Sequence, residues 1–211
     1  MAHFSHCIES RDSEGLRDYA RRCIDAVYFN NTQHELGITT ISLIHGNALG
    51  GGLEAALSSA IIIVERQAKL GFPEVLFNLF PGMGAYNLLM QRVSPSMTEK
   101  IILSGKQYSA QEFYELGVID ELVDEGGGES AVNSYIRSSR NRLNSLKAMK
   151  KVRSCVNPLS YQAMLDIGDI WVDAAMNLTE KEIRMMSKLV NSQINFASKV
   201  SNPVTSQALA Y

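Results

Sequence analysis

Basic clusters, metal-ligand spacings and long apolar runs are all missing from this chain of 211 residues. Its 20 lysines and arginines are balanced by 22 aspartates and glutamates, and they form no run that would bind a phosphate backbone. The longest apolar stretch, around residues 60–64, is far too short to cross a bilayer. The first ten residues lack the apolar segment of a signal peptide. These absences argue against nucleic-acid and membrane partners and predict a cytoplasmic protein.

Cysteine is also scarce. The three cysteines, Cys7, Cys23 and Cys155, cannot all pair within one chain, and none lies in a CxxC spacing. We therefore expect free thiols in a reducing compartment. The four histidines and three cysteines show no ligand spacing, so no metal site is predicted.

Apolar periodicity and glycine positions predict an α/β fold with a largely parallel sheet. Apolar residues at helical spacing are followed by a β-branched run, a glycine turn, a second helix and two further short strands. The expected elements are a helix at 12–29, a strand at 38–44, glycines at 50–52, a helix at 53–59 and strands at 60–65 and 68–74.

A glycine-rich break, EGGGES at 125–130, divides the chain into two predicted parts. Residues 1–125 form the expected α/β core, and residues 126–211 form a helical region. Within this second part, apolar spacing predicts helices at about 131–153, 158–176 and 179–198.

The three glycines at 50–52 lie between a predicted strand and a predicted helix. Such a turn can serve close packing of helix on sheet, or its free N–H groups can stabilise an anion, including an oxyanion that forms during a reaction. Glu54 follows the turn among leucines and alanines. It is either a helix-start charge favoured by the helix dipole or a buried carboxylate, which is costly without a partner or a function.

Glu74 lies in LGFPEVLFNLFPG, where every close neighbour is apolar. A carboxyl group in such surroundings has a raised pKa and can act as an acid or a base near neutral pH. Glu54 and Glu74 could therefore share one site, in which one carboxyl group takes a proton while the other gives one.

Three stretches resemble the crotonase (enoyl-CoA hydratase/isomerase) superfamily: HGNALGGGLEAALS, GFPEVLFNLFPGMGA and SGKQYSAQEFYELGVIDELV. The two glutamates are 20 positions apart, as are the catalytic pair of its hydratases, and the likeness covers about 38–125. The resemblance implies a crotonase-like (ClpP/crotonase) fold, with a ββα spiral core and a C-terminal helical subdomain. Members of the superfamily usually form trimers or hexamers, which implies a homo-oligomer.

Within that superfamily, EAALSSAIIIVERQAKLGFPEVLFNLFPGMGAYNLL and DIGDIWVDAAMNL are similar to the synthases of diffusible signal factors, the cis-2-unsaturated fatty acids of bacterial quorum sensing. These enzymes dehydrate a 3-hydroxyacyl chain on acyl carrier protein and then hydrolyse the thioester, without a cofactor. The resemblance implies that Glu54 and Glu74 are the acid/base pair and that Gly51 donates an oxyanion N–H. The residues implied to bind the acyl chain are Leu49, Gly50, Gly82, Met83 and Trp171.

The N-terminus departs from the superfamily pattern. MAHFSHCIES resembles what lies just beyond an upstream GGDL-like stretch that supplies the second oxyanion N–H, so we expect a shortened member without the first strands. Loss of one such donor costs roughly 10²–10³ in rate. Three hypotheses follow: a signal-factor synthase, a hydratase or isomerase acting on CoA thioesters, and an inactive relative that only binds partners, such as a full-length paralogue or a signal sensor protein.

Overall fold

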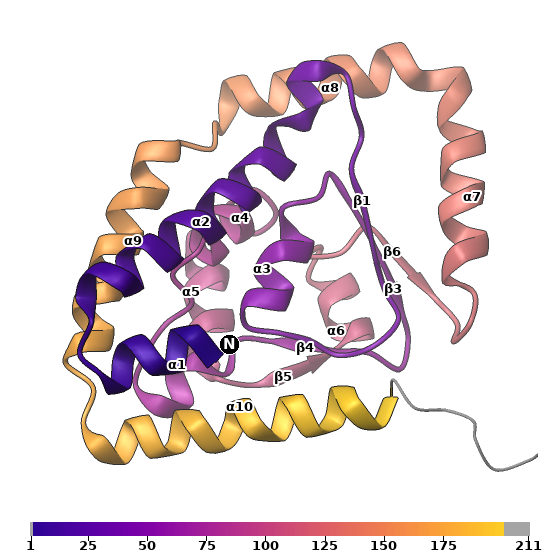
Figure 1. Ribbon diagram of the computed structural model, residues 1–211. Helices are drawn as coiled ribbons and strands as arrows, with labels where there is room; N and C mark the ends of the chain where they lie inside the picture. Colours follow the sequence, from indigo (N-terminus) through magenta and orange to yellow (C-terminus); the bar gives the residue numbers. More distant parts are fainter. Residues whose placement is uncertain (1, 201–211) are drawn as a thin grey trace, which may run out of the picture.

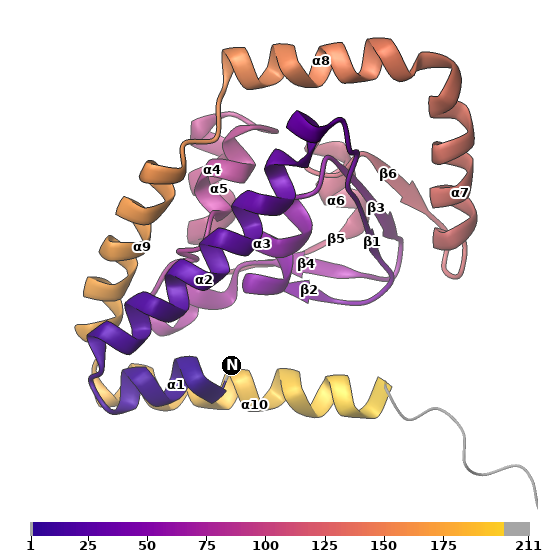
Figure 2. The ribbon, with the colours of Figure 1, turned by 45° about the horizontal axis from the view of Figure 1, so that its top comes forward.

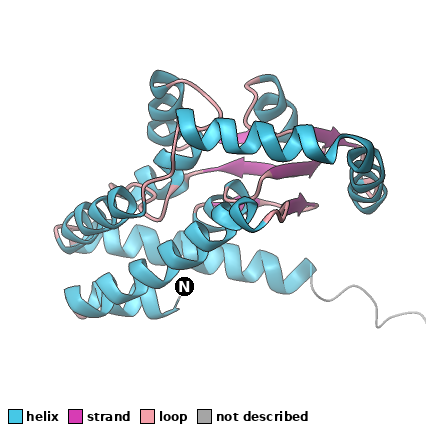
Figure 3. Ribbon diagram, turned by 90° about the horizontal axis from the view of Figure 1, so that it is seen from above, coloured by secondary structure: helices cyan, strands magenta, loops and turns pink. Residues whose placement is uncertain are grey.

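The computed structural model describes residues 2–200, with side chains described over residues 3–190. Its strands form two small sheets, with the orders β1-β3-β6 and β2-β4-β5. Figure 3 shows these strands enclosed by helices. The strands are β1 (Ile41–Ile44), β2 (Ala48–Leu49), β3 (Ile61–Glu65), β4 (Lys69–Gly71), β5 (Gln107–Ser109) and β6 (Glu121–Val123).

The first sheet is parallel throughout. Ile41 of β1 pairs with Ile61 of β3, and Ile63 of β3 pairs with Glu121 of β6. The central strand β3 is almost fully buried, as expected for an IIIVE run in a parallel sheet covered on both faces. Strand β1 forms an edge and is only half-buried.

The second sheet pairs β2 with β4 in parallel and β4 with β5 in antiparallel orientation. Helices α3 and α6 contact strands of both sheets and so join them into one body. Because β2 leads directly into α3, the start of α3 is fixed by the pairing of β2 with β4.

Helices and the loops between them make up the rest of the described chain. Figures 1 and 2 show the last four of them running around the outside of the two sheets. Within residues 2–200, no helix is both long enough and apolar enough to cross a membrane. The helices are α1 (Ala2–Glu9), α2 (Ser13–Thr32), α3 (Gly51–Leu57), α4 (Ala85–Met90), α5 (Pro95–Ser104), α6 (Ala110–Glu115), α7 (Gly128–Ser139), α8 (Leu143–Val156), α9 (Tyr161–Met176) and α10 (Glu180–Val200), with 3₁₀ turns η1 (Gln33–Leu36), η2 (Pro73–Phe77) and η3 (Arg140–Arg142).

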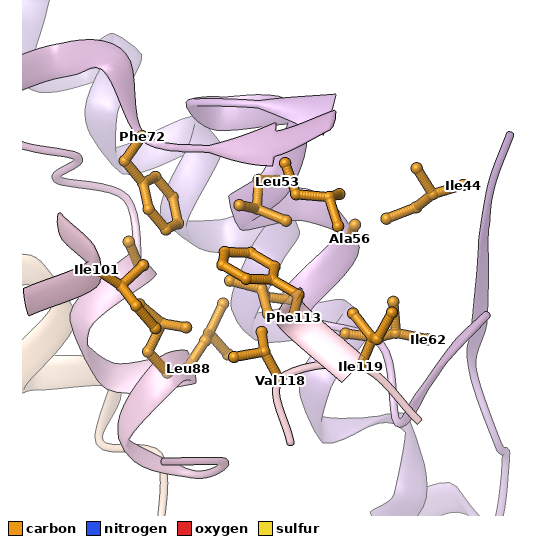
Figure 4. Close-up of a cluster of buried hydrophobic side chains, with 14 of the residues drawn as sticks. Ile44, Leu53, Ala56, Ile62, Phe72, Leu88, Ile101, Phe113, Val118 and Ile119 are labelled. Atoms are coloured by element: carbon orange, nitrogen blue, oxygen red, sulfur yellow. The ribbon is translucent and has the colours of Figure 1, made fainter. Parts of the chain in front are cut away.

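Two apolar clusters hold these elements together. The larger lies between the sheets and helices α3–α6, where Leu53, Phe72 and Phe113 are buried side by side (Figure 4). The smaller gathers α1, α2, η2, α9 and α10 around Trp171 and Leu79. The C-terminal helices therefore share a core with the N-terminal ones.

The α/β class with a largely parallel sheet is confirmed, and several boundaries are corrected. The third predicted strand ends at Gly71, because Pro73 begins a 3₁₀ turn, and Glu74 lies on that turn. The predicted helix at 131–153 is divided by η3. The glycine-rich break at 125–130 is not a free linker, because Gly128 begins α7 and is buried beside Leu43 and Glu65.

Candidate active site

The turn at Gly50 can be made only by glycine. Gly50 has φ 54° and ψ −129°, and its N–H donates to the carbonyl oxygen of Gly71 over 2.9 Å. A Cβ atom at residue 50 would also collide with Oε1 of Glu74. The turn therefore allows a carboxylate to lie directly against the backbone where α3 begins.

Two further N–H groups are free at this turn. Gly51 and Gly52 open α3, and neither N–H group has a hydrogen-bond acceptor within the described residues. Free N–H groups at the start of a helix are suited to stabilising negative charge on an oxygen.

Glu54 is buried in the first turn of α3, with only 2% of its surface exposed. Its Oε1 accepts hydrogen bonds from the N–H groups of Met83, over 2.9 Å, and Ala85, over 3.0 Å. Burial raises the pKa of Glu54 to about 7, although these two hydrogen bonds favour its ionised form and lower the pKa. A carboxyl group with this pKa can gain or lose a proton near neutrality.

Glu74 projects from η2 toward the same place. Its Oε2 is buried and has no hydrogen-bond partner in the described structure. Burial, and then repulsion from the charge of Glu54, raises the pKa of Glu74 to about 8. The two carboxyl groups thus titrate as an interacting pair and hold about one proton between them near neutral pH.

Both glutamates line a cavity of about 490 Å³ with mostly apolar walls. Every other residue predicted for the site also lines this cavity: Leu49, Gly50, Gly51, Gly82, Met83 and Trp171. Gly82 lies so close to Trp171 that a Cβ atom there would collide with the indole ring. The cavity can hold one molecule that has an apolar chain and a polar end, with the polar end beside the two carboxyl groups.

A sequence model described as enoyl-CoA hydratase/isomerase matches residues 28–163, which include the glycine turn and both glutamates. The chain belongs to this family. Among curated proteins, the fatty acid oxidation complex subunit alpha of Pseudomonas syringae pv. tomato is 37% identical to this chain over 89 residues. That alignment spans 42% of the chain but only 12% of the longer relative.

Solved structures with the same fold include the enoyl-CoA hydratase from Bacillus halodurans, with a TM-score of 0.75 and 22% identity over 87% of this chain and 74% of the other. An enoyl-CoA hydratase/isomerase from Xanthobacter autotrophicus Py2 has a TM-score of 0.68 and 21% identity, covering 94% and 75%. Pseudomonas aeruginosa DspI has a TM-score of 0.61 and 26% identity, covering 72% and 57%. The crotonase-like fold is thereby confirmed.

Several residues of the cavity wall were not predicted for this hydratase/isomerase-family site. Phe4 of α1 stacks on Trp171 with ring centroids 5.4 Å apart, and Tyr19 and Cys23 of α2 line the cavity beside them. The apolar spacing of α2 marked Tyr19 and Cys23 as helix-face residues. That pattern does not distinguish a cavity wall from a packed core.

A larger groove of about 890 Å³ runs along β1. Among the described residues, His45 is the only ionisable side chain that lines it, and no carboxylate pair faces it. The groove therefore offers no acid/base pair, and the smaller cavity is the better candidate for chemistry.

The close contact between Gly82 and Trp171 predicts that Gly82→Ala will destabilise the fold by about 1–3 kcal/mol, the usual cost of overpacking. Because Trp171 is the only tryptophan, its fluorescence should shift as the ring is displaced. Gly46→Ala is the control, since a Cβ atom there would meet nothing within 4 Å. Equal unfolding midpoints and spectra for both variants would refute the contact.

The raised pKa values predict that the free energy of unfolding falls as pH rises from about 4.3, the usual value for glutamate, to about 8. In this window the folded state keeps protons that the unfolded state has released, so stability is highest at the acid end. Urea unfolding across pH should show this slope. Glu54→Gln with Glu74→Gln should flatten it, and exposed Glu115→Gln should not; a slope unchanged in the double variant would contradict the prediction.

Proposed function

We propose that this chain is an acyl-thioester dehydratase with thioesterase activity, which forms a cis-2-unsaturated fatty acid from a 3-hydroxyacyl group on acyl carrier protein. One observation carries the proposal: two buried carboxyl groups, both with pKa values near neutrality, face one apolar cavity beside a glycine turn with free N–H groups. The cis-2 product and the carrier protein come from the resemblance to signal-factor synthases.

In the proposed dehydration, the thioester carbonyl lies at the turn, where Gly51 N–H stabilises negative charge on its oxygen. A carboxylate removes a proton from Cα, the Cα–C3 double bond forms, and the C3–O bond breaks. The second carboxyl group protonates the departing hydroxyl, which leaves as water. In the hydrolysis that follows, water adds to the same carbonyl and the carrier thiol departs.

The division of roles between the two glutamates is part of the proposal. We assign removal of the Cα proton to Glu74 and protonation of the leaving hydroxyl to Glu54. The resting pKa values favour the opposite placement of the shared proton, because the N–H groups of Met83 and Ala85 favour ionised Glu54, whereas burial and the charge of Glu54 raise the pKa of Glu74 further. The difference is small, since each pKa unit corresponds to about 1.4 kcal/mol, so the productive arrangement is accessible.

The acyl chain would lie along the apolar wall that Met83, Trp171 and Phe4 form. No metal or organic cofactor is needed for either step as written. By resemblance to the superfamily, we also propose that the protein works as a homo-oligomer, either a trimer or a hexamer.

A second candidate is a hydratase or isomerase that acts on CoA thioesters. The family model that matches residues 28–163 favours it, because that family is described as enoyl-CoA hydratase/isomerase. The third hypothesis, a relative that only binds partners, would leave the ionisable pair without a use.

We expect the purified 211-residue chain to release free cis-2-enoic acid from 3-hydroxyacyl-acyl carrier protein, identified by mass spectrometry. Glu54→Gln and Glu74→Gln should each lower the rate by about 10²–10⁴, the usual contribution of a general acid or base. Exposed Glu115→Gln should leave it unchanged. Turnover of CoA thioesters alone would favour the second candidate, and a folded protein without turnover on either carrier would favour the third.

Exchange of solvent deuterium into Cα separates the two roles. If Glu74 removes the Cα proton, exchange should persist in Glu54→Gln and disappear in Glu74→Gln. The reverse pattern would exchange the assignments while leaving the proposed reaction intact.

A further inference from the structure

A third and much smaller cavity, of about 50 Å³, lies at the opposite end of α3, beside α8. Residues Leu57, Ser59 and Ala60, at and after the end of α3, form one wall. Helix α8 forms another, where it packs on η1 beyond the end of α2 (Figures 1 and 2). Within the part of the chain that the structure describes, no residue lines both this cavity and the candidate active-site cavity, so the two are separate.

Three cationic side chains line this small cavity: Arg92, Lys150 and Arg153. The Nζ atom of Lys150 is buried and has no hydrogen-bond partner in the described structure. Burial and the nearby charge of Arg153 lower the pKa of Lys150. A buried ammonium group without a counter-ion is costly, so this arrangement is stabilised by any anion that enters.

The charge of Asp120 acts on Lys150 but meets this need only in part. Asp120 pairs with Arg92 over 3.1 Å, and it also accepts the N–H of Ile62 over 2.8 Å. Arg92 is further occupied by the carbonyl oxygens of Val118 and Ser59. Within the described residues, neither Lys150 nor Arg153 forms an ion pair.

Several neutral polar groups around the cavity already have hydrogen-bond partners. His34 Nε2 and Ser154 Oγ lie 2.8 Å apart, and the side-chain amide of Asn157 donates to the carbonyl oxygen of Met90. The charged donors left for a ligand within the described residues are those of the Lys150 ammonium and the Arg153 guanidinium, and the Gln91 side chain also lines the cavity.

Size limits the ligand. A cavity needs roughly 10–15 Å³ of this kind of space to hold one water molecule, so about 50 Å³ holds a group of a few heavy atoms and excludes a nucleoside. A tetrahedral oxyanion fits that size. It can also offer separate oxygens to the forked guanidinium and to the ammonium.

We propose that this cavity is a binding site for one phosphate-class oxyanion, held by Lys150 and Arg153 next to the Arg92–Asp120 pair. The ligand is either free phosphate or the phosphoryl group of a larger molecule, and both present the same oxygens to the two cations. The site is independent of the proposed activity.

The test uses the full chain with Lys150→Met, which keeps an apolar side chain of similar length and removes the charge. Lys151→Met is the matched control, because Lys151 is exposed on the same helix. Inorganic phosphate, compared with chloride at equal ionic strength, should raise the Tm of the wild type and of Lys151→Met but not of Lys150→Met. Calorimetric titration should show binding at least tenfold weaker for Lys150→Met.

Without phosphate, Lys150→Met should be at least as stable as the wild type, since it removes an unpaired buried charge. This measurement shows whether the variant is folded, and Arg153→Gln provides a second variant in which phosphate binding should weaken. Equal Tm responses in Lys150→Met and Lys151→Met would overturn the proposal, as would the absence of any response in the wild type.

Titration with CoA distinguishes the two sources of the phosphoryl group. Binding of CoA that depends on Lys150 would place a phosphoryl group of a larger molecule in the cavity. Binding of inorganic phosphate that CoA does not displace from this site would assign it to the free ion.

Discussion

The site depends on how closely a carboxylate approaches the backbone at Gly50. Two constraints restrict residue 50 to glycine. One is its positive φ, and the other is the Glu74 oxygen that occupies the place of a side chain. This approach brings Glu74 to the glycine turn and into the field of Glu54. Because the space around the turn is filled by protein atoms, both carboxyl groups are buried. This burial raises the pKa values of Glu54 and Glu74 toward neutrality.

The fold supports this arrangement with backbone groups and not with cations. Glu54 is held by the N–H groups of Met83 and Ala85, and no lysine or arginine pairs with either glutamate in the described part of the chain. A cationic partner would lower the pKa and keep the carboxylate ionised. Backbone donors fix the position of Glu54 while leaving it able to accept a proton, which is what the proposed acid/base reaction requires.

The sequence predicted those features whose signal is local. Helix α2 follows from its apolar spacing, β3 from its β-branched run, and Glu54 and Glu74 from being charges in apolar stretches. Short strands such as β2 carry too few residues for any period to be seen. Phe4 was not predicted because an apolar residue on a helix gives the same sequence pattern whether it packs in a core or lines a cavity.

The burial of Lys150 could not be predicted either, since a lysine in a helix rich in basic residues is typical of a solvated face. Its position depends on α8 reaching the end of α3. Helix α3 has seven residues and spans about 10 Å, so its two ends face different sites. Its amino end favours the negative charge that the proposed reaction places on the thioester oxygen. Its carboxyl end favours the positive charges of Lys150 and Arg153. Such end effects amount to about 0.3–1 kcal/mol per charge, so one helix joins the two sites while their electrostatic coupling stays weak.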